Sequence, residues 1–326
     1  MADVVVLGQV GRDLVVRTRS LPEAGGSTTA EDLRELLGGK GANQAVALAQ
    51  LGVPVALVGV VGDDGPGRQV RDQAAADGID VSCVVVRPDA GTALLLDLVE
   101  DGGRRRLVEH VPPEVLLTPG DVAAAAGELR SCQVLLAQLQ QPGDAIRAAL
   151  GLVPDTAFVV SDGAPADEAT RAAVIARAAV VRADAVEAGR LAGRPLAGVD
   201  EAREAAAELL TAGPRLVALS VGEAGDLVVW RAGPTLGAAS RDPEVDPRWA
   251  DGEVLVPHLG PPPMDPTGAG DAYAAVLTAS LLGGAGPEEA AWAASAAAAV
   301  TVAHAGGRPQ LDAGALGEVI RRHRAA

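Results

Sequence analysis

Short apolar runs alternate along this chain with alanine-rich runs, and that alternation restricts the folds it can adopt. The apolar runs are five to eight residues long, the usual length of a buried strand. The strands predicted in this way are residues 4–8, 55–62, 132–139, 157–162, 178–184 and 215–222. Predicted helices lie between them at residues 42–52, 67–78, 142–150, 167–176 and 201–212. Continuous apolar strands that alternate with helices predict an α/β fold, with a mostly parallel central sheet sandwiched by helices.

Two segments contain strand-like runs with no helix between them. They are residues 11–37 and 81–112, and the second contains "EDGGRR", a hairpin turn signal, at residues 100–105. We expect both segments to form a small β-sheet inserted into a single domain over residues 1–326. Residues 242–263 are rich in proline and acidic residues and predict a loop or an insertion.

Composition excludes several classes of function. The formal net charge is −16, whereas a surface that binds nucleic acid needs a basic face, so we expect no nucleic-acid partner. No run of 18 uncharged apolar residues occurs, and the N-terminal residues lack the basic start of a signal peptide, so we expect no membrane partner. Cys83 and Cys132 are too few for a disulfide framework, and we expect two small core residues in a reducing cytoplasm.

The stretch "GGKGANQA", residues 38–45, is a glycine-rich turn that leads into a predicted helix. It is not a phosphate-binding P-loop, because Gly41 follows Lys40 where that motif requires serine or threonine. Glycines let a ligand approach the backbone, and Lys40 and Asn43 at a helix start suit a polyhydroxyl or phosphate ligand. A tight strand-to-helix turn without a ligand would account for the glycines equally well.

A second glycine-containing turn, "DPTGAGDAY" at residues 265–273, also precedes an alanine-rich helical run. The backbone N–H groups of Gly268, Ala269 and Gly270 would point out of the helix N-terminus and form an anion site. Asp271 in the first turn would stabilise the helix by about 0.3–1 kcal/mol, which is the simplest explanation for it. That explanation leaves the glycines unaccounted for, since each weakens a helix by roughly 1 kcal/mol. An anion hole beside a carboxylate is the arrangement needed for phosphoryl transfer to a hydroxyl group.

These two turns resemble, in order and separation, the two signatures of the ribokinase-like carbohydrate kinases. Residues 4–15, 59–67, 220–225 and 303–310 resemble further parts of that family, so the resemblance covers nearly the whole chain. It implies a parallel-rich sheet between helices, a small β lid over the sugar, and a homodimer formed through the lid. It also implies an enzyme, a phosphotransferase that moves the γ-phosphoryl of ATP to a sugar hydroxymethyl group with Mg²⁺.

The resemblance assigns roles to individual residues of the catalytic and sugar sites. Asp271 corresponds to the general base, and Gly268, Ala269 and Gly270 to the anion hole. Asp13 corresponds to the aspartate that holds sugar hydroxyls, although a turn-capping role is the alternative. The expected substrate-binding residues are Gly11, Asp13, Gly39, Lys40, Asn43 and Gln140.

Nucleotide and cation sites are implied in the same way. Asp184 and Glu187 stand where the family has N-x-x-E, and they would hold hydrated Mg²⁺, unless they are only helix N-terminal acids. The expected nucleotide-binding residues are Asp184, Ser220, Gly222, Gly225 and Ser295. Asp265 and Thr267 match a site for K⁺, which is expected to raise activity. The remaining, mostly backbone, ligands would come from Thr301, His304, Gly306 and Gln310.

The sequence departs from the family mainly in the parts that would contact sugar. Gln140 stands where ribokinases have a glutamate, and Gly11 stands where many members have asparagine. Losing a charged hydrogen bond costs roughly 1.5–3 kcal/mol, which is enough to change the order of preferred sugars. The expected acceptor is therefore ribose or a related furanose or keto-sugar. A nucleoside kinase and a non-catalytic sugar- or nucleotide-sensing protein are the alternatives.

Overall fold

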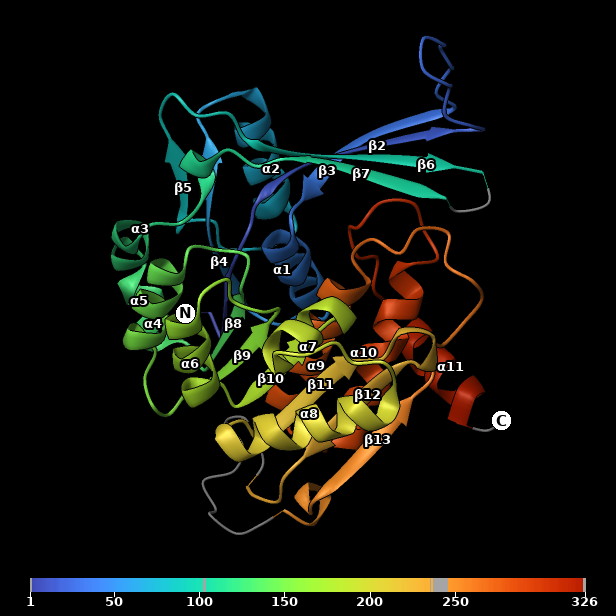
Figure 1. Ribbon diagram of the computed structural model, residues 1–326. Coiled ribbons are helices and arrows are strands. Elements are labelled where there is room, and N and C mark those ends of the chain that lie inside the picture. The colour runs from blue at the N-terminus through green and yellow to red at the C-terminus, as the bar shows by residue number, and fades with distance from the viewer. Residues whose placement is uncertain (1, 102–103, 235, 237–245, 325–326) are drawn as a thin grey trace.

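The computed structural model describes residues 2–101, 104–234, 236 and 246–324, and Figure 1 shows its helices and strands in chain order. The strands are β1 (Val4–Leu7), β2 (Gly11–Thr18), β3 (Asp32–Gly38), β4 (Val55–Gly62), β5 (Val84–Arg87), β6 (Ala93–Glu100), β7 (Arg105–His110), β8 (Val134–Gln138), β9 (Phe158–Asp162), β10 (Val180–Ala183), β11 (Leu216–Ser220), β12 (Asp226–Trp230) and β13 (Gly252–Val256). The helices are α1 (Lys40–Gln50), α2 (Gly65–Ala76), α3 (Pro119–Ala124), α4 (Ala126–Ser131), α5 (Gly143–Leu152), α6 (Glu168–Arg177), α7 (Ala185–Ala192), α8 (Val199–Ala212), α9 (Ala269–Leu282), α10 (Pro287–Thr301) and α11 (Ala313–Arg324).

Within the described ranges the central sheet has nine strands, in the order β13-β12-β11-β10-β9-β8-β1-β4-β5. Every neighbouring pair from β11 to β5 is parallel, whereas β12 and β13 are antiparallel to their neighbours. The prediction of a mostly parallel sheet is therefore confirmed. Because parallel strands end at the same edge, the residues that follow β1, β8, β9, β10 and β11 are gathered there, where open α/β sheets bind ligands.

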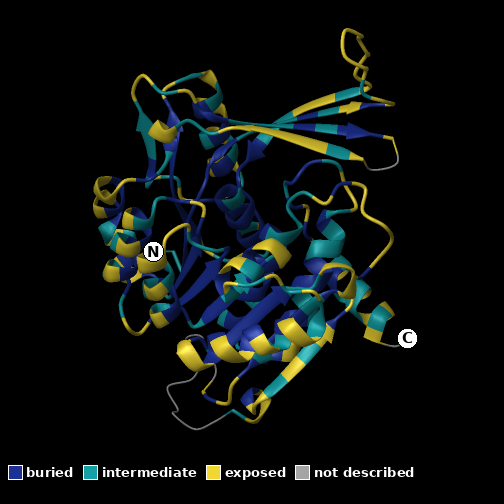
Figure 2. Ribbon diagram, viewed as in Figure 1, coloured by how far each residue is buried: buried dark blue, intermediate teal, exposed yellow. Residues whose placement is uncertain are grey.

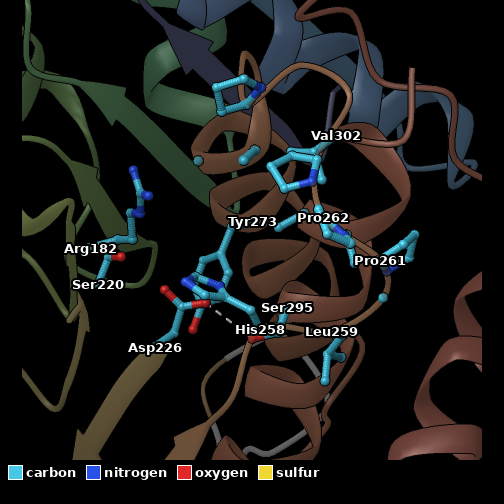
Figure 3. Close-up of a pocket in the computed structure, with 17 residues that line it drawn as sticks. Arg182, Ser220, Asp226, His258, Leu259, Pro261, Pro262, Tyr273, Ser295 and Val302 are labelled. Carbon is cyan, nitrogen blue, oxygen red and sulfur yellow. Dashed lines mark hydrogen bonds between the residues drawn. The ribbon is translucent and has the colours of Figure 1, made fainter. Parts of the chain in front are cut away.

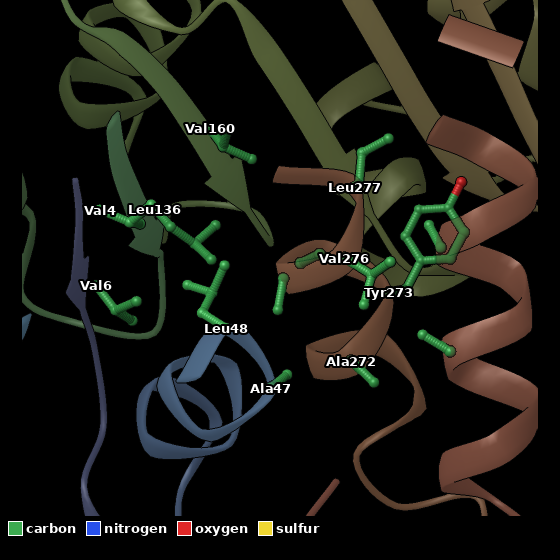
Figure 4. Close-up of a cluster of buried hydrophobic side chains, with 14 of the residues drawn as sticks. Val4, Val6, Ala47, Leu48, Leu136, Val160, Ala272, Tyr273, Val276 and Leu277 are labelled. Atoms are coloured by element: carbon green, nitrogen blue, oxygen red, sulfur yellow. The ribbon is translucent and has the colours of Figure 1, made fainter. Parts of the chain in front are cut away.

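Helices cover both faces of this sheet, as the continuous apolar strands predict (Figure 1). Alternate residues of β1 enter different cores: Val4 and Val6 pack with α1, α9 and α10, while Val5 and Leu7 pack with α5, α6 and α8. Figure 4 shows the first core, in which Val4 and Val6 face Leu48 of α1. The strands between the two helical layers are dark blue, and so buried, in Figure 2.

A second sheet, in the order β3-β2-β6-β7, extends beyond the central sheet in Figure 1. We call it the lid sheet. It contains the helix-poor segments expected to pair, and Asp13 on β2 lies opposite Leu95 on β6. The strands β6 and β7 form the expected antiparallel hairpin, although turn residues 102–103 lie outside the described residues. One expectation was wrong: β5, inside segment 81–112, pairs with β4 and belongs to the central sheet.

The prediction of a loop over residues 242–263 also needs correction. Residues 242–245 lie outside the described part, but Gly252–Val256 forms β13, which pairs with β12 at the sheet edge. Its alternating sequence, GEVLV, fits a half-buried edge strand, and the prolines on either side concealed it. Of the two free cysteines, Cys132 is buried as expected, whereas Cys83 is partly exposed. Among the described helices, none has the length and apolar character needed to cross a membrane.

Candidate functional site

The two glycine-rich turns meet at the carboxyl edge of the central sheet. Gly39 precedes α1 with φ = 89°, and a Cβ there would lie 2.8 Å from the carbonyl oxygen of Gln9. Only glycine fits where the backbone at residue 39 passes the backbone at Gln9, because the φ is left-handed and the two backbones touch. Asn43, in the first turn of α1, lies beside the first turn of α9, where its Nδ2 donates to Oδ2 of Asp271 at 3.1 Å.

Asp271 is a buried carboxylate, only 6% exposed, in the first turn of α9. Burial raises its pKa to about 7, and repulsion from Asp162 adds to the shift, while Lys40 and the hydrogen bond from Asn43 oppose it. A carboxyl group whose pKa lies near neutrality can both accept and release a proton, which is the property of a general base.

Asp13 on β2 is a second buried carboxyl group at this site. Burial raises its pKa to about 7, and repulsion from Asp97 and Asp271 adds to the shift. Its Oδ1 is buried without a hydrogen-bond partner, and so is Oδ1 of Asn43. Buried acceptors normally have partners, so these two acceptors from separate elements are available to a ligand that supplies O–H or N–H donors.

The second turn exposes the N-terminus of α9. Gly268 caps the helix with φ = 75°, and a Cβ there would lie 1.9 Å from the carbonyl oxygen of Gly307. Glycine is therefore required both by its conformation and by the close approach of another loop. The N–H groups of the first helical turn have no helical partners, so they can hold an anion next to Asp271.

Arg182 at the end of β10 lies directly beside this helix N-terminus, and it was not among the residues expected at the site. A Cβ on Gly270 would lie 2.7 Å from both terminal nitrogens of Arg182, so glycine leaves room for the guanidinium group. Arg182 Nη1 donates to Asp162 Oδ1 at 2.8 Å, and Gln44 Nε2 donates to Asp162 Oδ2 at 2.7 Å. Burial alone would lower the pKa of Arg182, but the ion pair with Asp162 offsets this and keeps it above its ordinary value.

The sequence did contain a signal for this pair. Asp162 and Arg182 both lie near the carboxyl ends of predicted neighbouring strands, at the edge where sites form in parallel sheets.

Arg182 also lines a cavity of about 540 Å³ (Figure 3). Ser220 and Ser295, two of the expected nucleotide residues, line it together with Ala269 and Gly270 of the second turn. Ser295 donates to the carboxylate of Asp226 at 3.3 Å, shown by the dashed line in Figure 3.

Gly222 and Gly225, also expected at the nucleotide, shape the turn between β11 and β12. Their φ angles are 53° and 109°, and the carbonyl oxygen of Gly222 lies 2.7 Å from Nε2 of His258, which lines the cavity. The two glycines therefore allow the tight turn that lies next to the cavity wall.

Asp184 and Glu187 form a capping box at the start of α7. Oδ1 of Asp184 accepts from the N–H of Val186 and Glu187, and Oε2 of Glu187 accepts from the N–H of Asp184. The other oxygen of Glu187 lies 3.7 Å from Nζ of Lys40, which connects α7 to the first turn. The described residues contain no group of three or more His, Cys, Asp or Glu side chains that could hold a metal ion. Any Mg²⁺ here would need further ligands from water or phosphate.

At the site expected for K⁺, the carboxylate of Asp265 already accepts hydrogen bonds from the protein. Asp265 is fully buried, and its Oδ1 accepts from the backbone N–H and the hydroxyl of Thr267, while its Oδ2 accepts from the N–H of Gly306 at 2.7 Å. The remaining ligands were expected to be mostly backbone oxygens, which side-chain positions do not test: Thr301 Oγ1 donates to the carbonyl of Ala297, and His304 and Gln310 are exposed.

Comparison with known proteins identifies the family. The model of the pfkB family carbohydrate kinases matches residues 1–313 of this chain. The chain belongs to this family. It is therefore a sugar kinase in class, a phosphotransferase with an alcohol group as acceptor, as the two turns predicted.

Curated relatives of this chain include proteins named ribokinase and deoxyribokinase. The chain is 33% identical over 156 residues to the ribokinase of Schizosaccharomyces pombe, a match that spans 46% of this chain and 49% of that protein. It is 26% identical over 272 residues to the deoxyribokinase of Salmonella typhi, which covers 83% of each.

Solved structures of other proteins share this fold. The Arabidopsis thaliana ribokinase complexed with ribose and ATP has a TM-score of 0.76 and 21% identity, over 98% of this chain and 99% of that one. An Escherichia coli protein solved with ATP and Mg²⁺ has a TM-score of 0.77 and 19% identity, over 99% and 100%.

This pfkB kinase does not bring all the expected substrate residues together. Gln140 is exposed and lines a different cavity, with Arg171 and Arg190 among its neighbours. A Cβ at Gly11 would lie 2.9 Å from the carbonyl oxygen of Ala93, so the lid packing leaves no room for a side chain there. By contrast Asp13, Lys40 and Asn43 do converge beside Asp271.

Proposed function

We propose that this protein transfers the γ-phosphoryl group of ATP to a hydroxymethyl group of ribose or a related furanose or keto-sugar. The observation that carries the proposal is the pair of unpartnered buried acceptors, Asp13 Oδ1 and Asn43 Oδ1, beside Asp271. A sugar presents several O–H donors on one small ligand, so it can satisfy both acceptors while placing one more hydroxyl at Asp271. The names of the Schizosaccharomyces pombe and Salmonella typhi relatives support a pentose as acceptor.

Asp271 is the proposed general base. Its pKa of about 7 leaves much of the group ionised at neutral pH, while keeping it basic enough to accept a hydroxyl proton. Asn43 donates to one carboxylate oxygen and so fixes the orientation of the carboxylate. The other oxygen is left to accept the proton from the acceptor hydroxyl.

The α9 N-terminus and Arg182 are the proposed holders of the transferred phosphoryl group. Gly268, Ala269 and Gly270 supply N–H donors that need no reorganisation when negative charge develops. Arg182 adds a fixed positive charge beside Gly270, and its planar group can give two parallel hydrogen bonds to phosphate oxygens. In a chain of net charge −16, these local donors have to hold the anion.

The proposed ATP site is the cavity of about 540 Å³ beside Arg182, which has Ser220 and Ser295 in its wall. Mg²⁺ bound to the nucleotide would neutralise phosphate charge, and Glu187 and Asp184 would hold it through water. The structures of the Arabidopsis thaliana and Escherichia coli proteins with ATP support this assignment of the donor.

We also propose that the protein forms a homodimer through the lid sheet. Leu33, Leu107 and Val108 are exposed apolar side chains on its two edge strands, β3 and β7. Exposed strand edges with apolar side chains favour pairing with a second chain. Light scattering tests the dimer, because a single monomeric mass at micromolar concentration would contradict it. The free cysteines are compatible with the proposed cytoplasmic location.

The function is tested by measuring ADP release from Mg-ATP with pentoses, hexoses, keto-sugars and nucleosides in turn. Phosphorus NMR of the product then identifies the phosphorylated position. We expect turnover with a pentose or a keto-sugar, and a rate at least about 100-fold lower in a parallel preparation of Asp271→Asn, which controls for contaminating kinases. Turnover with nucleosides alone would replace the sugar by a nucleoside as acceptor. Sugar or ATP binding without turnover would indicate a sensing protein instead.

A further inference from the structure

Arg105 of the lid sheet reaches the loop that carries the catalytic turn. Its Nε donates to Asp97 Oδ1 on β6 at 2.6 Å and lies 3.5 Å from Oδ1 of Asp265. The hydroxyl of Thr267, two residues after Asp265, lies within hydrogen-bond distance of carboxylate oxygens of both Asp265 and Asp97, the latter at 3.1 Å, and shares its one hydrogen between them. One guanidinium group and one hydroxyl thus join a lid hairpin to the loop that precedes Gly268.

Asp265 cannot be left without a compensating positive group. It is 0% exposed, and Asp97 is 3% exposed, so two carboxyl groups share one dry region. Isolated charges in such a region are strongly unfavourable, and two like charges more so. Arg105 is itself only 20% exposed, and it is the cation that the structure places against both groups.

Asp265 also joins the loop before α9 to the loop after α10. Oδ2 of Asp265 accepts from the N–H of Gly306 at 2.7 Å, so the loop before α9 is joined directly to the loop after α10. Next to Gly306, the carbonyl of Gly307 lies against Gly268, the first residue of the anion site. The position of the anion site therefore depends on Asp265 keeping its charge and its partners.

We propose that Arg105 supplies the positive charge at Asp265, in place of a monovalent cation, so that phosphoryl transfer does not require K⁺. The charge comes from a lid strand, which makes Arg105 a positioning residue for the anion site: it acts through Asp265 and touches neither substrate. The inference rests on the proposed kinase function.

The first test compares initial rates in KCl, NaCl and N-methyl-D-glucamine chloride at equal ionic strength, with saturating Mg-ATP and the sugar found in the screen. We expect the wild-type rates to agree within about twofold, and activation by K⁺ of fivefold or more would overturn the inference. Absence of turnover in every salt would instead contradict the proposed function. Thermal unfolding keeps the inference testable in that case, because the wild-type midpoint should be the same in KCl and N-methyl-D-glucamine chloride. A K⁺-specific rise would overturn it.

The second test removes the positive charge of Arg105. Arg105→Met should lose at least tenfold in kcat in N-methyl-D-glucamine chloride and should become activated by K⁺, while KM for ATP changes little. Its unfolding midpoint should likewise become K⁺-sensitive. Full activity of Arg105→Met without K⁺ would overturn the inference. Arg105→Lys, which keeps the charge, should remain K⁺-independent, and this variant decides the question if Arg105→Met does not fold.

Arg106→Met is the matched control for a lost lid arginine. Arg106 is the next residue on β7, it is mostly exposed, and its partner is Glu100 rather than Asp265. We expect its rates and its response to K⁺ to equal those of the wild type. A K⁺ requirement in Arg106→Met equal to that in Arg105→Met would mean that general weakening of the lid causes the effect, and the inference would fail.

Discussion

The side-chain amide of Asn43 donates to the carboxylate of Asp271 at 3.1 Å, across a sequence separation of 228 residues. This bond joins the first turn of α1 to the first turn of α9, so it joins the two glycine-rich turns of the sequence. A buried carboxylate that accepts one defined hydrogen bond keeps its second oxygen in a defined direction. The proposed base is therefore oriented before any ligand binds.

Replacement of the base should separate folding from chemistry. We expect Asp271→Asn to lose roughly 10²–10⁴ in kcat, the usual contribution of a general base, while ATP binding persists. Because burial raises the folded-state pKa from 3.8 to about 7, the ionised group destabilises the fold as pH rises through this window. The variant should thus unfold at an equal or higher temperature than the wild type at pH 8. Asp144→Asn, in the first turn of α5 and exposed, is the control.

The pH dependence of the reaction follows from the same group. Asp271 must be ionised to accept a proton, so kcat/KM should fall as pH decreases below about 7. At pH 6 the rate should be about tenfold below its plateau at high pH. Asp13 also has a pKa of about 7 and repels Asp271, so the fitted value belongs to the pair. A flat profile from pH 8 down to pH 5.5 would argue against Asp271 as the base.

Arg182 can be tested without leaving Asp162 unpaired. Removing one partner of a buried ion pair costs about 3–5 kcal/mol, so Arg182→Gln alone should lower the unfolding temperature. The double variant Arg182→Gln with Asp162→Asn should recover most of that stability. We expect it to remain about 10- to 100-fold slower in kcat, because the charge beside the phosphoryl group is gone. Wild-type kcat in the double variant would show that the pair is only structural.

Gly268 offers a test of the anion site itself. Gly268→Ala combines a left-handed φ of 75° with a Cβ placed 1.9 Å from the carbonyl oxygen of Gly307. Gly284→Ala is the matched control, because its φ is 82° but nothing lies within 4 Å of the new Cβ. We expect the control to lose only about 1–2 kcal/mol in free energy of unfolding, the cost of a left-handed φ in alanine, with unchanged kcat. Gly268→Ala should unfold at a lower temperature and turn over more slowly; equal effects in calorimetry and kinetics would refute the close approach.

The sequence predicted the parallel sheet because its strands are buried on both faces and so read as uninterrupted apolar runs. It failed at edges, where pairing depends on a partner elsewhere in the chain. β13 lies between prolines and was taken for a loop, and β5 lies inside a helix-poor segment and was assigned to the lid. At the site, Asp271 and Asn43 were predicted because each stands in a short pattern with its glycines. Arg182 has no such pattern, since its role comes from Asp162 and Gly270, which reach it only through the fold.

By itself the sequence determined the fold class, the two turns and the chemistry that they permit, because strand periodicity and helix N-termini are local properties. Only the tertiary structure decided which charges meet. It placed Arg182 against Gly270, left Gln140 in another cavity, and set Arg105 of the lid against Asp265. Charge interactions in a dry site depend on a few ångströms and on burial, and neither quantity is contained in the spacing of residues along the chain.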